Sequence, residues 1–280
     1  MLGALIIVFR EVIEAGLIVG IVMAVTQGVR GSRLAIVAGV AAGAVGASLV
    51  AAFAGAIGEA LAGIGQEIFN ASILLIAVAM LTWHNVWMAS HGRELAAGVK
   101  RVGEAVRAGS QSIFALGIVC AVAVMREGAE VALFMYGLVA SAGSTTAELV
   151  IGSLLGLAAG VGVTGLTYLG LMAIPQRRLF AVTTALISLL AAGLAAQAVR
   201  FLQQAGVLTM LSQTAWDTSA ILSDTSLFGR VLRTLIGYSD QPSVLQVVVY
   251  VATLAVIVVL TKTVGSRGTP GVKAHRAAAG

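Results

Sequence analysis

The sequence has few charged residues and a single cysteine. Only 10% of its 280 residues are Asp, Glu, Lys or Arg, whereas soluble domains carry about a quarter. This scarcity of charge excludes an ordinary soluble domain, and the lone Cys120 excludes a framework of disulfide bonds within the chain. Apolar residues make up 59% of the chain, and its mean hydropathy is +1.01. These values are typical of a protein embedded in a membrane.

A concentrated basic region and a cleavable signal peptide are also missing. The isoelectric point is about 9.9, but the basic residues are scattered in short connections. Membrane topology explains such a distribution, so we expect no nucleic-acid partner. The first apolar run is too long for a signal peptide and carries charges in its middle.

Long apolar runs recur along the whole chain. Because about 18 apolar residues suffice for a helix to cross a bilayer, they predict an all-α, polytopic membrane protein with seven transmembrane helices. We expect one transmembrane domain at 1–264 and a disordered cytoplasmic tail at 265–280. The expected helices lie at roughly 2–27, 34–57, 68–90, 112–141, 148–174, 179–205 and 244–263.

The connections between these runs differ in their basic residues. The second and fourth connections contain no Lys or Arg, and the only charged side chains around them are Glu59, Glu67 and Glu148. By the positive-inside rule, the first, third and fifth connections and the tail are cytoplasmic, and the N-terminus lies outside. The basic residues of these segments are Arg30, Arg33, Arg93, Lys100, Arg101, Arg107, Arg177, Arg178, Arg267, Lys273 and Arg276.

The sixth connection, at about 206–243, is the only long one on the outer side. Within it, apolar residues recur at helical spacing between Leu227 and Ile236, opposite Arg230 and Arg233. This pattern predicts a short amphipathic helix lying on the membrane surface.

Two charged motifs lie in the middle of apolar runs and match each other. FREVIEAG contains Arg10, Glu11 and Glu14, and MREGAEVA contains Arg126, Glu127 and Glu130, 116 positions later. The following helices also match, GVAAG at 39–43 with GLAAG at 156–160, 117 positions later. We therefore expect an inverted repeat, with repeat A at about 1–90 and repeat B at about 112–205, which is a transporter architecture with its site near the membrane midplane. The helix at 244–263 is added to this repeat.

These motifs predict a cation site. Glutamates three positions apart share a face of a helix, and Arg and Glu four apart can pair; because charge at the membrane centre is costly, none of these side chains should face lipid. Four carboxylates and two guanidiniums sum to a charge of −2, and carboxylate oxygens suit hard cations such as iron. Two other interpretations stay open, namely ion pairs that lock helices together and a proton relay for an organic substrate.

Other polar residues are accessory candidates. His84 lies within the apolar run at 68–90, where a lone histidine is more often a hydrogen-bonding partner than a ligand. Glu67 opens the same run on the outer side, where it could attract cations. Asp217, in the sixth connection, is either a surface ligand or a helix cap in WDTS.

The paired R-E-x-x-E motifs resemble those of the oxidase-dependent high-affinity iron permease family of fungi and bacteria. The likeness extends to LTWHNVWM at 81–88, AAQAVRFLQQAG at 195–206 and WDTSAILSDTS at 216–226. It implies an iron permease in which Glu11, Glu14, Glu127, Glu130 and their arginines are required. The family's usual motif is R-E-G-L-E, so the two motifs here keep the charges and vary the spacers. Asn70 stands where some relatives carry a further glutamate.

The resemblance implies a protein of the plasma (inner) membrane that is not an enzyme and imports iron, as Fe²⁺ or Fe³⁺, without a permanently bound cofactor. It also implies a ferroxidase, or a periplasmic iron-binding or haem-peroxidase protein, as partner, and leaves a homo-oligomer open. Two alternative functions remain. One is transport of another divalent cation, such as lead or manganese, since carboxylates discriminate weakly among metals. The other is an intramembrane metalloenzyme, although the three histidines lie on different segments and form no H-E-x-x-H motif.

Overall fold

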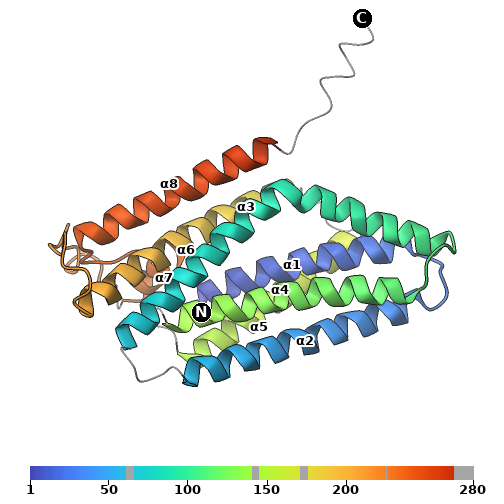
Figure 1. Ribbon diagram of the computed structural model, residues 1–280, viewed down its shortest axis with the longest axis horizontal. Coiled ribbons are helices and arrows are strands. Elements are labelled where there is room, and N and C mark those ends of the chain that lie inside the picture. Colours follow the sequence, from blue (N-terminus) through green and yellow to red (C-terminus); the bar gives the residue numbers. More distant parts are fainter. Residues whose placement is uncertain (61–65, 141–144, 171–175, 225, 268–280) are drawn as a thin grey trace, which may run out of the picture.

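The computed structural model describes residues 1–60, 66–140, 145–170, 176–224 and 226–267. Within these ranges the chain forms seven long helices and one short helix (Figure 1). Their bounds are α1 Leu2–Val25, α2 Ser32–Ala60, α3 Gln66–Arg107, α4 Phe114–Ala140, α5 Thr146–Tyr168, α6 Gln176–Gln204, α7 Leu227–Ile236 and α8 Val244–Arg267. The predicted all-helical fold is confirmed.

Five of these helices are long and apolar enough to cross a membrane, at Ser32–Phe53, Glu67–Met88, Thr146–Tyr168, Ala181–Gln204 and Val244–Val264. Helices α1 and α4 have comparable length but each carries three charged residues close together in its middle. The two helices that fall outside this group by composition are therefore the two that contain the R-E-x-x-E motifs.

Helix α3 is much longer than the run from which it was predicted. The expected helix ended at about residue 90 and was followed by a loop, whereas α3 continues through the basic segment to Arg107. This segment is rich in Glu, Ala, Lys and Arg, which favour helix, and its Val99 and Val106 are buried. The predicted helix ended with its apolar run at about residue 90, so the prediction missed the polar extension to Arg107.

Two other boundaries also differ. Helix α8 continues through Arg267, so the predicted tail at 265–280 begins within a helix, and residues 268–280 lie outside the described residues. Helix α5 ends at Tyr168 rather than near 174, and the expectation for 171–175 likewise falls outside the described residues.

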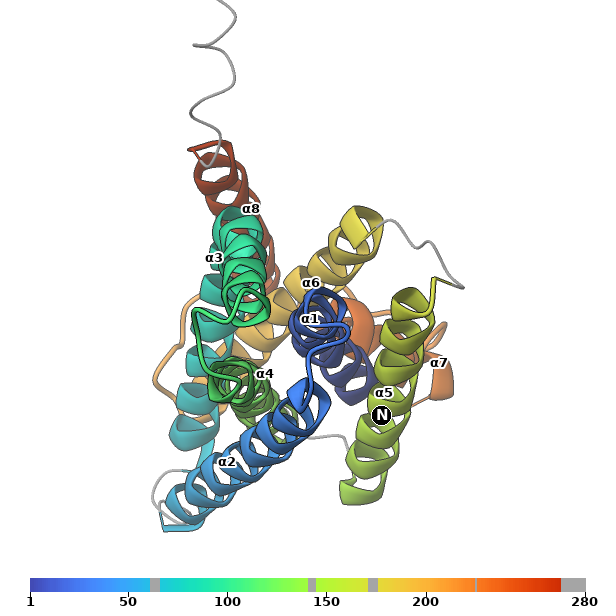
Figure 2. The ribbon, with the colours of Figure 1, turned by 90° about the vertical axis from the view of Figure 1, so that its right-hand side faces the viewer.

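Each half of the chain packs one of its helices against a helix of the other half. Helix α2 packs along α4, and α5 packs along α1, so each motif helix is covered by a helix from the other half (Figure 2). Glycines allow this close approach. A Cβ atom at Gly43 would lie 2.6 Å from the carbonyl oxygen of Ala121, and one at Gly156 would lie 2.6 Å from that of Leu5.

These contacts correct the match between α2 and α5. Gly43 faces Ala121, Val124 and Met125 on α4, and Gly156 faces Leu5, Val8 and Phe9, which are the residues 116 positions earlier on α1. Gly43 and Gly156 are therefore equivalent by contact, and they lie 113 positions apart. The sequence match of 39–43 with 156–160 placed the pairing one helical turn too far, because GxxxG spacing repeats along both helices and fits more than one register.

The interior consists of two apolar clusters. One joins the N-terminal parts of α1 and α3 and the C-terminal part of α4 to α6 and α8, and includes Ile7, Leu81 and Phe134. The other joins the opposite halves of α1, α3 and α4 to the start of α2, and includes Ile18, Val99 and Ala123. On each of α1, α3 and α4, the stretch between the two clusters contains polar residues. They are Arg10, Glu11 and Glu14 on α1, His84 and Asn85 on α3, and Arg126, Glu127 and Glu130 on α4. The fold thus places a polar layer between two apolar ones.

The long connection between α6 and α8, which contains α7, is folded back on itself. Backbone hydrogen bonds from Ala215 to Pro242 and from Thr218 to Asp240 close it. The position of the predicted helix on a membrane surface stays a prediction, and the helix itself is confirmed as α7. Its C-terminal Gly237 packs against Gly193 of α6, eleven residues, or about 16 Å of helical rise, before the end of α6. The amphipathic pattern predicted the helix, but such a pattern does not show the contact between Gly237 and Gly193 that joins α7 to α6.

The glycine contacts between α1 and α5 give a testable prediction. We expect Gly156→Ala to destabilise the protein by about 1–3 kcal/mol, since the new methyl group would overlap the α1 backbone. Gly162→Ala is the matched control on α5, because nothing lies within 4 Å of its Cβ position. The apparent melting temperature in detergent measures the effect, and equal values for the two variants would contradict this packing.

Candidate metal site

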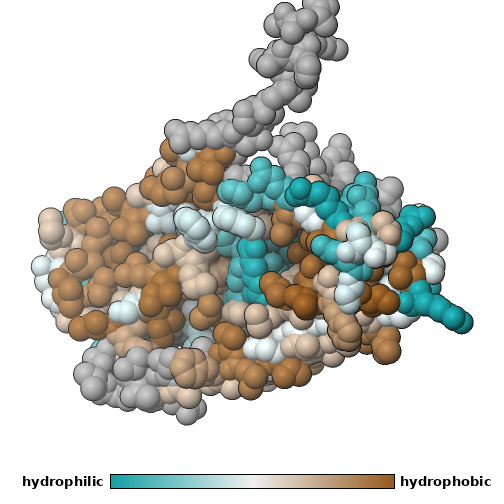
Figure 3. Space-filling model, turned by 45° about the vertical axis from the view of Figure 1, so that its right-hand side comes forward, coloured by the Kyte–Doolittle hydropathy of each residue, from teal (hydrophilic) through white to brown (hydrophobic). Residues whose placement is uncertain are grey.

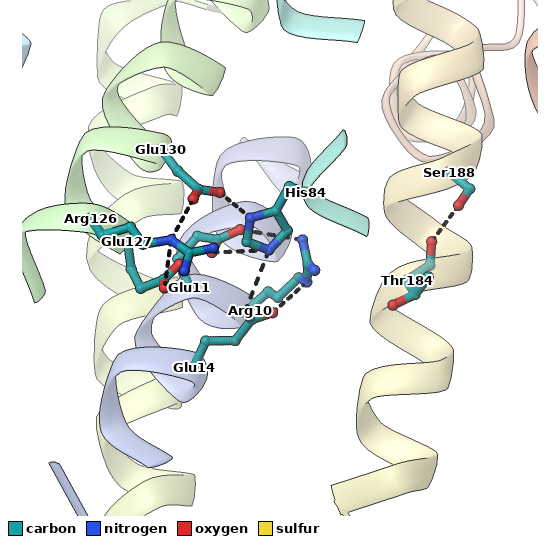
Figure 4. A network of polar contacts seen from close by, with 9 residues as sticks. All are labelled: Arg10, Glu11, Glu14, His84, Arg126, Glu127, Glu130, Thr184 and Ser188. Atoms are coloured by element: carbon teal, nitrogen blue, oxygen red, sulfur yellow. Dashed lines mark hydrogen bonds and ion pairs between the residues drawn. The ribbon is translucent and has the colours of Figure 1, made fainter. Parts of the chain in front are cut away.

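The two R-E-x-x-E motifs meet where α1 contacts α4. Glu11 and Glu14 are less than one helical turn apart on α1, and Glu127 and Glu130 are spaced in the same way on α4. Figure 4 shows these side chains pointing toward one another across the two helices. The structure thus brings all four predicted glutamates, with both arginines, into one cluster.

Most of this cluster is buried. Arg10 and Glu11 are each 1% exposed, Glu127 is 2% exposed and Glu14 is 3% exposed. Within the described part of the chain, one carboxylate oxygen of Glu11 and one of Glu127 make no hydrogen bond. A buried ionised group without a partner is costly, so these oxygens make the cluster a candidate site for a cation.

Each arginine pairs with the glutamates of its own motif. Arg10 Nε lies 2.9 Å from Glu14 Oε1, and one of its terminal nitrogens lies 3.4 Å from Glu11 Oε1. Arg126 Nε lies 3.2 Å from Glu130 Oε1 and 3.7 Å from Glu127 Oε1. The predicted pairing of residues four apart is therefore confirmed in both motifs.

The two arginines differ in their surroundings. Arg10 is enclosed, whereas 33% of the Arg126 side chain is exposed. The Arg126 guanidinium lies 4.2 Å from the ring centroid of Trp87, in a cation–π contact. Arg126 and Trp87 therefore border the cluster on its more accessible side. Sequence reasoning did not assign a role to Trp87, although it lies in the matched stretch LTWHNVWM.

His84 lies between the two motifs and is 3% exposed. Its Nε2 is 3.4 Å from Glu14 Oε2 and 3.9 Å from Glu11 Oε2, and its Nδ1 contacts Glu130 Oε2 (Figure 4). Donor atoms of Glu11, His84, Glu127 and Glu130 all lie within 4.8 Å of one another. The sequence analysis predicted only an accessory role for His84, because the sequence of α3 does not show that this residue lies between α1 and α4.

Asn85 is a buried polar residue that the sequence analysis did not assign. It is 2% exposed, and neither its amide nitrogen nor its amide oxygen has a hydrogen-bond partner among the described residues. The signal available in the sequence was an Asn beside a His in the middle of an apolar helix.

The other accessory candidates do not join the cluster. Glu67 is exposed and lies 17 residues before His84 on α3, which corresponds to about 25 Å of helical rise, and Asn70 lies about 21 Å away by the same measure. Asp217 instead closes a turn, accepting hydrogen bonds from the backbone and hydroxyl of Ser219 and from Gln241. The hydroxyl of Ser219, followed by its backbone N–H and Gln241, lowers the pKa of Asp217 below its usual value. Asp217 therefore stabilises a turn, and no described helix begins there for it to cap.

A bundle of long apolar helices around a buried cluster of carboxylates defines an integral membrane protein with a candidate cation site. The model of the iron permease FTR1 family matches residues 1–266. The chain therefore belongs to the iron permease FTR1 family, a family of transporters, and not to a family of enzymes. This result confirms the resemblance and the iron-transport function predicted from the paired motifs, and does not favour the alternative functions.

Named relatives agree with the family. The ferrous iron permease EfeU of Shigella flexneri is 35% identical over 186 residues, which cover 66% of this chain and 78% of the relative. The ferrous iron permeases EfeU of Escherichia coli O157:H7 and of Shigella sonnei are also 35% identical over 186 residues, covering 67% of each relative. No solved structure matches this chain.

The different burial of the two arginines gives a prediction about stability. We expect Arg10→Met to cost about 3–5 kcal/mol, because it leaves buried carboxylates without their countercharge. Arg126→Met should cost less, since 33% of the Arg126 side chain is exposed and its partner Glu130 keeps its contact with His84. Thermal unfolding of both variants in one detergent tests this, and an equal loss in the two would contradict it.

Proposed function

We propose that this protein carries ferrous iron across the membrane through a site formed by Glu11, Glu14, Glu127 and Glu130. The observation that carries the proposal is the convergence of both motifs, with donor atoms from α1, α3 and α4 within 4.8 Å of one another. The relatives are named ferrous iron permeases, which supports Fe²⁺ as the substrate.

The charge of the cluster supports a divalent substrate. Four carboxylates and two guanidiniums leave a charge of −2, which one Fe²⁺ ion neutralises. A charge of this size inside an apolar bundle is costly when unmatched, so the site attracts a cation strongly and holds it away from lipid. The role of the arginines in this proposal is to orient the carboxylates and to limit the charge of the empty site.

We further propose that seven helices, α1–α6 and α8, span the membrane, and that α1–α3 and α4–α6 form an inverted repeat. The exchanged packing of α2 on α4 and of α5 on α1 supports this arrangement, as do the matched contacts of Gly43 and Gly156. In such an architecture the pseudo-two-fold axis passes near the substrate site. We therefore expect the axis of this repeat to pass close to the cluster at the contact between α1 and α4.

The proposed orientation places the N-terminus outside and the C-terminus in the cytoplasm of a plasma (inner) membrane. The connection between α1 and α2, the extension of α3 and the end of α8 all point to the same end of the molecule (Figure 1). Hydrophilic side chains gather toward this end, and apolar side chains cover much of the rest of the visible face (Figure 3). Basic residues on this end, such as the exposed Lys100, support a cytoplasmic position.

Partners are proposed only from the family resemblance. A ferroxidase, or a periplasmic iron-binding or haem-peroxidase protein, would meet this chain on its outer side, where the folded connection between α6 and α8 lies. Assembly of several copies remains a further prediction of the same kind.

The proposal predicts that iron uptake depends on both motifs. In proteoliposomes supplied with external Fe²⁺ under anaerobic conditions, Glu14→Ala and Glu130→Ala should each lower uptake at least about tenfold, because each removes a carboxylate from the cluster. Glu104→Gln is the matched control, because Glu104 is 54% exposed and pairs with Lys100 outside the cluster.

Near-normal uptake by both alanine variants, with correct insertion shown by elution and melting behaviour, would overturn the proposed site. Parallel measurements with Mn²⁺ and Pb²⁺ separate iron transport from general divalent transport. Faster uptake of either ion than of Fe²⁺ would contradict iron as the substrate and leave the site in place.

A further inference from the structure

His84 occupies a position that a carboxylate-only site does not need. It comes from α3, outside both motifs, and both of its ring nitrogens face carboxylates of different helices. One nitrogen contacts Glu130 of α4, and the other lies 3.4 Å from Glu14 of α1 (Figure 4). The imidazole thus fills the space between the two halves of the cluster.

The spacing of the donor atoms fits one ion. Metal–ligand distances for nitrogen and oxygen are about 2.0–2.2 Å, so donors on opposite sides of an ion lie up to about 4.4 Å apart. The donor atoms of Glu11, His84, Glu127 and Glu130 lie within 4.8 Å of one another. A movement of a few tenths of an ångström would therefore let all four contact the same cation.

We propose that His84 is a direct nitrogen ligand of the transported ion and that it determines the preference of this site for Fe²⁺ over Mg²⁺ and Ca²⁺. The inference rests on the proposed transport site and adds a ligand to it. Oxygen-only sites suit Mg²⁺ and Ca²⁺, whereas imidazole suits Fe²⁺ and its neighbours among the transition metals. Bundles that bind iron between helices combine glutamate and histidine in the same way.

The charge of the site is consistent with this role. A neutral imidazole adds a ligand without adding charge, so the −2 of the motifs remains matched to a divalent ion. A fifth carboxylate at this position would instead raise the negative charge and favour hard cations. The position of His84 therefore confers selectivity among divalent ions at an unchanged net charge.

The test is X-ray absorption of Fe²⁺ bound to the purified full chain in nanodiscs under anaerobic conditions. The wild-type spectrum should contain the scattering of an imidazole ring bound to iron. His84→Gln should remove that scattering and lower Fe²⁺ affinity at least about tenfold, while the affinities for Mg²⁺ and Ca²⁺ change less than about twofold. His91→Gln is the matched control, because His91 lies on the same helix, stacked on Trp87, and outside the cluster.

A second variant keeps the test decisive if His84→Gln folds poorly. His84→Cys replaces the nitrogen by a thiolate, and Co²⁺ bound to this variant should show a sulfur-to-metal charge-transfer band in the near ultraviolet. Wild-type protein should not show it, since its only cysteine, Cys120, is buried in the apolar cluster of α4.

The outcomes separate the two proposals. Iron that binds wild-type protein without imidazole scattering would overturn the role of His84 and leave the glutamate site intact. An unchanged ratio of Fe²⁺ to Mg²⁺ affinity in His84→Gln would do the same. Failure of the wild type to bind Fe²⁺, or undiminished binding by the double variant Glu11→Gln/Glu127→Gln, would instead overturn the proposed function.

Discussion

The structure depends on one constraint, which is that four carboxylates and only two guanidiniums share a buried space between α1 and α4. Each arginine pairs with two glutamates of its own motif, and oxygens of Glu11 and Glu127 still lack hydrogen bonds. Ion pairs that only locked helices together would need as many positive as negative charges, because an uncompensated buried charge is strongly destabilising. The transported cation that we propose would balance this excess of negative charge.

The rest of the fold supports this polar layer. Apolar clusters on either side hold α1, α3 and α4 in register, so that the polar residues of all three helices occur at the same depth. Glycines of α2 and α5 let each motif helix be covered closely by a helix from the other half. Glu11, Glu14 and Glu127 are thereby almost fully buried, and the proposed ion would offset the cost of their buried charge.

Much of the fold, and the four glutamates and two arginines of the candidate site, could be predicted from the sequence for physical reasons. Long apolar runs identify spanning helices, and two copies of R-E-x-x-E identify the charged cluster because charge is so rare in such a chain. The extension of α3 to Arg107 was missed because it is polar and its burial depends on Val99 and Val106. The position of His84 was undervalued because a contact between three helices leaves no pattern in one of them. The sequence match between α2 and α5 was placed one helical turn too far because small residues repeat every four positions in both helices.

The central claim is that a single ion contacts both motifs at once. The most direct measurement is a structure of the protein with Fe²⁺ bound, with data collected at the iron absorption edge so that anomalous scattering locates the metal. The account predicts one strong peak between α1 and α4, within about 2.2 Å of carboxylate oxygens from both Glu11 and Glu127. A peak that contacts only one motif, or that lies outside this polar layer, would contradict it.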